Sequence, residues 1–91
     1  MADNTWTKDP DAVLDWHFDW TDWLASGEAL LTSTFFVTSG IVVNSSSFTS
    51  SNTTVWLSGG SAGTPYLVTN RITTSQGRTD DRSVTVRVKD R

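Results

Sequence analysis

The single histidine, His17, lies at alternating spacing between Asp15 and Asp19, so this triplet is the first place where catalytic chemistry could be sought. A histidine that takes the proton of a serine while a carboxylate orients it makes a nucleophilic triad. The letters Gly-x-Ser-x-Gly occur once, at residues 59–63, but in a glycine-rich loop between two predicted strands, whereas the elbow that presents such a serine turns sharply from a strand into a helix. We therefore predict that the chain is not an enzyme and that His17 is a surface or interface side chain.

Carboxylates also gather near the N-terminus, and oxygen-rich clusters of this kind can bind calcium. An EF-hand pattern is absent, and no close Asp-x-Asp-x-Asp loop with a glycine turn occurs. On one strand, Asp15 and Asp19 would stand about 13 Å apart at roughly 3.3 Å per residue, which is too far for one ion to bridge. We predict no metal and no cofactor. A calcium-dependent domain that uses Asp9, Asp11 and Asp15 is the alternative, and a calcium-dependent melting shift would support it.

Charge is distributed unevenly along the chain. Residues 1–28 hold seven acids and one base, whereas residues 29–91 hold three acids and six bases, for a net charge of −3. The mildly acidic total argues against general nucleic-acid binding. Opposite patches of this kind suit contacts between subunits, although the cations near the C-terminus could equally protect a strand edge. The residues predicted at a partner interface are Trp6, Lys8, Asp9, Asp11, Asp15, Asp19, Arg82, Arg87 and Lys89.

Five tryptophans are many for a chain of 91 residues. Trp16 and Trp20 fit the apolar face of a strand, so we expect them in the core. Trp6 lies in a segment without apolar neighbours, and tryptophan is enriched at binding anchors, so we expect it to dock on another subunit. An exposed Trp56 or Trp23 leaves open a carbohydrate-binding module for host attachment, and a change of tryptophan fluorescence on a glycan panel would support that alternative.

Alternation of β-branched or aromatic residues with polar ones predicts strands with one buried face. It does so in six segments, namely 13–20, 29–38, 41–49, 53–58, 66–75 and 82–89. Short strands separated by turns favour an all-β fold, here an immunoglobulin-like (Ig-like) β-sandwich of about six to seven antiparallel strands. Residues 1–12 show no periodicity and are predicted to form an extended N-terminal arm, with residues 13–91 as the single sandwich domain.

One local motif supports this fold class. Gly60, Gly63, Thr64 and Tyr66 precede two alternating segments, as at the end of many Ig-like domains, where the tyrosine packs at a corner and its hydroxyl bonds to nearby backbone. The sequence has no cysteine, which excludes disulfides and thiol chemistry. No apolar run is long enough for a membrane helix, and the first residues lack the features of a signal peptide, so we expect no membrane partner and no Sec-type export.

Two groups of motifs resemble a known family. The first is Lys8 to Trp16, followed by Asp19-Trp20 and Trp23-Leu24. The second covers residues 55–60, 62–64, 68–74 and 77–83. Together they resemble small structural proteins of tailed bacteriophages that are described as fiber-tail adaptors, and the similarity spans most of the chain from Lys8 to Val88.

The resemblance implies a non-enzymatic virion protein that joins tail or neck components, such as a tail fiber. It implies several copies, which we expect in a symmetric ring, with other virion structural proteins as partners. The expected location is the tail or neck of the virion, after synthesis in the host cytoplasm. Capsid decoration and head–tail joining are alternatives that the same resemblance leaves open.

Overall fold

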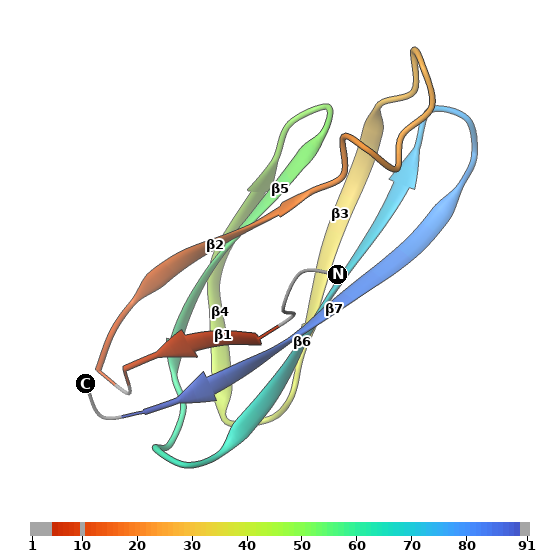
Figure 1. The fold of residues 1–91 in the computed structure, drawn as a ribbon. Coiled ribbons are helices and arrows are strands. Elements are labelled where there is room, and N and C mark those ends of the chain that lie inside the picture. The colour runs from red at the N-terminus through yellow and green to blue at the C-terminus, as the bar shows by residue number, and fades with distance from the viewer. Residues whose placement is uncertain (1–4, 10, 90–91) are drawn as a thin grey trace.

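The computed structural model describes residues 5–9 and 11–89, which form seven β-strands in two facing sheets (Figure 1). The all-β class is therefore confirmed. The strands are β1 (Thr5–Lys8), β2 (Leu14–Asp19), β3 (Leu30–Val37), β4 (Ile41–Phe48), β5 (Asn52–Gly59), β6 (Pro65–Thr74) and β7 (Thr79–Val88). Among the described residues, no helix is long and apolar enough to cross a membrane.

One sheet has the strand order β1-β7-β6-β3, and the other has the order β2-β5-β4. All pairs are antiparallel except β1 and β7, which run parallel. In Ig constant domains the second, fifth and fourth strands share one sheet, and the third, sixth and seventh share the other. The observed order is compatible with that arrangement, and the Ig-like identity stays a prediction.

The N-terminal segment differs from its sequence prediction. Residues 5–8, which were expected in an extended arm, form β1 and pair with residues 85–88 of β7. The pairing depends on backbone hydrogen bonds along β7, and a strand of four residues is too short to show side-chain periodicity. Residues 1–4 and 10 of the predicted arm lie outside the described residues.

The core lies between the sheets and follows the alternation of the sequence. Val55 and Leu57 of β5 point inward and are buried, whereas Trp56 between them is exposed. On β6 and β7 the same alternation buries one face of each strand, and the residues buried there are Tyr66, Val68, Asn70, Ile72, Thr74, Val84, Val86 and Val88. Trp20 has no exposed surface, as its placement in the core requires, while Trp16 is half-buried.

Tyr66 occupies a tight corner at the start of β6. Its hydroxyl accepts a hydrogen bond of 2.9 Å from the backbone N–H of Ser61, so the predicted bond to nearby backbone is confirmed. Gly40 approaches the ring so closely that an added Cβ would lie 2.9 Å from Cε1 of Tyr66, and its φ of 110° is one that glycine adopts readily. The corner therefore needs glycine next to the tyrosine.

Asn70 connects the two sheets through the core. Its Oδ1 accepts hydrogen bonds from Nε1 of Trp20 at 3.0 Å and from Oγ1 of Thr53 at 2.7 Å. Its Nδ2 donates to Oγ of Ser33 at 2.9 Å and to the carbonyl of Thr34 at 3.2 Å. Because buried polar groups are costly without partners, this satisfied amide fixes how the sheets face each other.

Candidate partner-binding surface

Trp6 has aromatic neighbours within its own chain. Its ring stacks on Trp16 with centroids 4.7 Å apart and meets the edge of Phe18 at 5.2 Å. The prediction that Trp6 has no apolar neighbours is therefore wrong. The parallel pairing of β1 with β7 places Trp6 beside β2. Docking of Trp6 on a second subunit stays a prediction, and part of its surface is exposed.

We expect Trp6→Ala to lower the stability of the isolated chain by about 1–3 kcal/mol, since it removes an apolar ring and a stacked pair. Chemical denaturation of the purified variant measures this loss. Leu67→Ala, which truncates another partly exposed apolar residue, is the control and should cost less. An unchanged unfolding free energy for the Trp6 variant would contradict the packing role and leave partner docking as the reason for this tryptophan.

Lys8 lies inside the fold rather than at the surface. It has no exposed area, and its Nζ donates to the carbonyls of Asp9 and Gly59, both at 2.8 Å. Burial lowers the pKa of its ammonium group, and the neighbouring carboxylates oppose that shift. In this chain the ammonium group of Lys8 lies beneath the surface and is held by the chain's own carbonyls, and its placement at a partner interface stays a prediction.

Asp19 and Arg82 meet each other within the chain. Nη1 of Arg82 donates to the backbone carbonyl of Asp19 at 2.7 Å, and its guanidinium lies 4.2 Å from the centre of a Trp20 ring. The carboxylate of Asp19 accepts a hydrogen bond from the backbone N–H of Thr21 at 2.9 Å, and hydrogen bonding to Thr21 lowers the pKa of Asp19. Both residues thus contribute to the fold, and a partner role for them stays a prediction.

Asp15, His17 and Thr54 form a chain of hydrogen bonds on the outer side of β2 and β5. Nδ1 of His17 lies 2.9 Å from Oγ1 of Thr54, and Nε2 lies 3.2 Å from Oδ2 of Asp15. The His17 and Asp15 side chains are 61% and 43% exposed, so their interaction is solvated and weak. His17 is thus a surface residue, as predicted.

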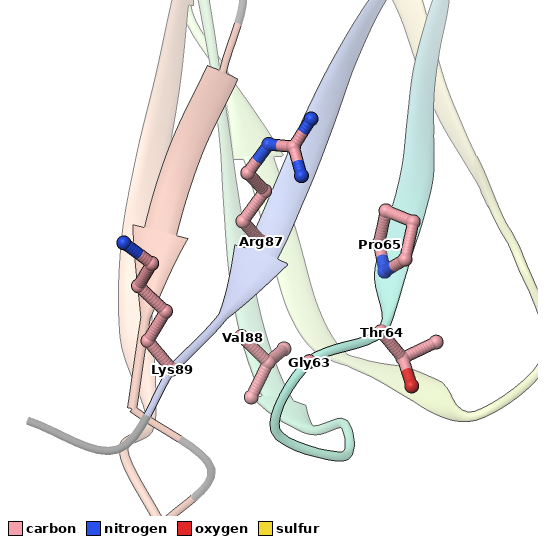
Figure 2. A pocket seen from close by; sticks show the side chains of 6 residues that line it. All are labelled: Gly63, Thr64, Pro65, Arg87, Val88 and Lys89. Carbon is pink, nitrogen blue, oxygen red and sulfur yellow. The ribbon is translucent and has the colours of Figure 1, made fainter.

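Arg87 and Lys89 line a small groove at the end of β7, which Figure 2 shows from close by. The end of β7, with Lys89 directly after it, forms one wall of the groove, and the start of β6, with Thr64 directly before it, forms the other. Both cations are exposed. Two exposed positive side chains beside a short groove can receive a carboxylate of a partner.

Acidic residues lie at the same end of the molecule. Asp11 is exposed and its backbone N–H donates to Oδ1 of Asp9 at 2.8 Å, in the turn between β1 and β2. Figure 1 shows this turn beside the end of β7. We call Asp11, Asp15, Arg87 and Lys89 the charged end, because all four are exposed and lie in or next to the turn between β1 and β2 or the end of β7.

Glu28, the most enclosed carboxylate among the described residues, was not among the residues predicted from the sequence. Nε of Arg78 donates to its Oε2 at 2.9 Å, and Nη2 of Arg78 contacts its Oε1. Oγ1 of Thr74 donates to Oε2 at 2.5 Å, and the backbone N–H of Ala25 to Oε1 at 2.9 Å. Hydrogen bonds from Arg78 first, and from Thr74 next, lower the pKa of Glu28 to about 2. Glu28 and Arg78 are far apart in sequence, so no local spacing indicated the pair.

The carbohydrate alternative named two tryptophans, and the structure places them differently. The Arg78 guanidinium lies 4.0 Å from the centre of a Trp23 ring, and Trp23 also packs against Trp20. Trp56 is 41% exposed on the outer side of β5, where it pairs with Asp15 of β2. In the part of the chain that is described, no group of three or more His, Cys, Asp or Glu side chains could hold a metal ion.

Comparison with known proteins gives one family. The family model described as "Podophage GP4 fiber-tail adaptor protein gp77" matches residues 8–87. No curated protein matches the chain. The matched region runs from the end of β1 to within one residue of the end of β7, so it covers both sheets.

Proposed function

This chain belongs to the podophage GP4 fiber-tail adaptor family, a family of phage structural proteins, and from that premise we propose that it links a tail fiber to the tail of the virion without catalysing a reaction. The match over residues 8–87 is the observation that carries the proposal. We further propose that several copies act together, arranged in a ring around the tail. An adaptor in such a ring needs at least two different contact surfaces.

The charged end is the surface that we assign to the partner. Its four side chains are exposed, unlike Lys8, and they include both signs of charge. Mixed charge at the rim of an interface speeds encounter and sets orientation more than it adds affinity. It also makes association sensitive to salt, because exposed charges are screened at high ionic strength.

We expect the double variant Arg87→Glu, Lys89→Glu to bind the adaptor's acidic partner at least about tenfold more weakly, since two attractions become repulsions. Purified tail and fiber proteins, mixed with and without this chain, would be followed by light scattering. The wild-type chain should bring both into one complex, and high salt should weaken it. The matched control is Arg71→Glu, Asp81→Arg, which exchanges an exposed ion pair elsewhere.

Particle imaging separates this proposal from its alternatives. Electron microscopy of intact virions should place the chain between tail and fiber. A position on the capsid surface or at the head–tail joint would overturn the fiber-linking role and favour the corresponding alternative. Equal fiber attachment with and without the chain would also overturn it.

A further inference from the structure

Charge is absent from a long central part of the sequence, since no Asp, Glu, Lys or Arg occurs between Glu28 and Arg71. This region contains β3, β4 and β5 and the first half of β6. Two of those strands, β3 and β4, are edge strands, one in each sheet. They lie near each other along one side of the sandwich (Figure 1). The fold therefore has one side whose open edges carry no charged residue.

An uncharged open edge is unusual for a chain that acts alone. An edge strand presents unpaired backbone N–H and C=O groups, and natural proteins protect it with charge, proline, bulges or short length. β3 has eight residues and includes no charged residue and no proline. Two of its apolar side chains are well exposed, Leu31 at 58% and Phe36 at 48%. The opposite edges differ, because β1 leads into Asp9 and Asp11, and β2 carries Asp15 and Asp19.

β3 is a better pairing edge than β4. The register of β4 shifts between Val43 and Ser45, in the first half of the strand, and a bulge of this kind interrupts regular pairing. The register of β3 shifts only at its start, between Leu30 and Thr32. From Thr32 to Val37 the strand is regular, so its free side offers a continuous row of backbone groups.

We propose that β3 pairs antiparallel with β3 of a second copy, which joins the two four-stranded sheets into one sheet. A strand of another copy complements this edge in backbone hydrogen bonding. Among the four edge strands, β3 itself is uncharged and regular over Thr32 to Val37, so the pair brings no charge into the contact. The exposed Phe36 of each copy lies on the outer face of the joined sheet and gains cover there. This inference is independent of the fiber-linking proposal, because a chain that stays monomeric could still connect fiber and tail.

The test uses the purified full chain and sedimentation velocity over a range of concentrations. We expect the wild type to change from the mass of one chain to that of two as concentration rises. Thr34→Glu puts a carboxylate in the middle of the β3 edge, and the two-fold symmetry of the pair brings two such groups close together. We expect at least about tenfold weaker self-association, because like charges across paired strands repel.

Two matched variants locate the contact. Ser83→Glu adds the same charge to the outer face of the same sheet, but on β7, which is an inner strand, so association should be unchanged. Ser46→Glu adds it to the β4 edge and should also leave association unchanged. Thr34 pairs with Arg71 on β6, so a glutamate at position 34 has a cation opposite it within the same sheet. Circular dichroism would confirm that the Thr34→Glu variant keeps the fold. A wild type that stays monomeric at every concentration, or a dimer broken only by Ser46→Glu, would overturn the proposal.

Discussion

Asn70→Ala is expected to lower the free energy of unfolding by about 3 kcal/mol, since it leaves hydrogen-bond donors in the core without an acceptor. Nε1 of Trp20 and Oγ1 of Thr53 both donate to Asn70, and the two residues have no exposed surface. An unsatisfied buried donor costs about 1–3 kcal/mol, and a cavity adds to that cost. Thermal melting should show a fall of roughly 15 °C for a domain of this size.

The matched control is Asn44→Ala, which removes the same side chain from the surface. Asn44 is exposed and accepts one hydrogen bond, from Oγ of Ser58 at 2.6 Å. Its loss should change stability by no more than about 0.5 kcal/mol, as is usual for surface positions. Equal effects of the two variants would show that Asn70 does not hold the sheets together.

Much of the sandwich could be predicted because burial acts on one side of each strand. The alternation around Val55, Leu57 and Val86 gave both the strand and its inward face, and those residues are fully buried. β1 could not be found in this way, since its position depends on the backbone of β7 at the other end of the chain. Residues 79–81 look like a turn by composition, yet they pair with β6, where Asp81 meets Arg71 at 2.8 Å.

The candidate surface was harder to predict for a related reason. The sequence separates acids from bases, but the fold brings them together, because the first strand lies beside the last. Arg82 reaches Asp19, and Arg78 reaches Glu28, so part of the apparent polarity is used inside one chain. In the folded chain, charge therefore differs most between the charged end, which carries both signs, and the edges formed by β3 and β4, which carry no charged residue.

The ion pair of Glu28 with Arg78 should make the stability of the protein depend on acid, because protonation of Glu28 removes the pair. The carboxylate has a pKa of about 2 in the folded protein, against 4.5 as its ordinary value. A group whose pKa is lower when folded stabilises the folded state above its unfolded pKa. Its contribution is therefore complete above pH 4.5 and disappears as the pH falls towards 2.

Glu28→Gln should lower the melting temperature by several degrees at neutral pH, because the amide cannot balance the charge of Arg78 above the Trp23 ring. The difference between wild type and variant should shrink as the pH falls from 4.5 to 2, since the wild-type carboxylate gains a proton there. Asp81→Asn is the control, because its ion pair with Arg71 is exposed and contributes little. A difference in melting temperature between wild type and Glu28→Gln that stays the same from pH 4.5 to pH 2 would refute the role of Glu28.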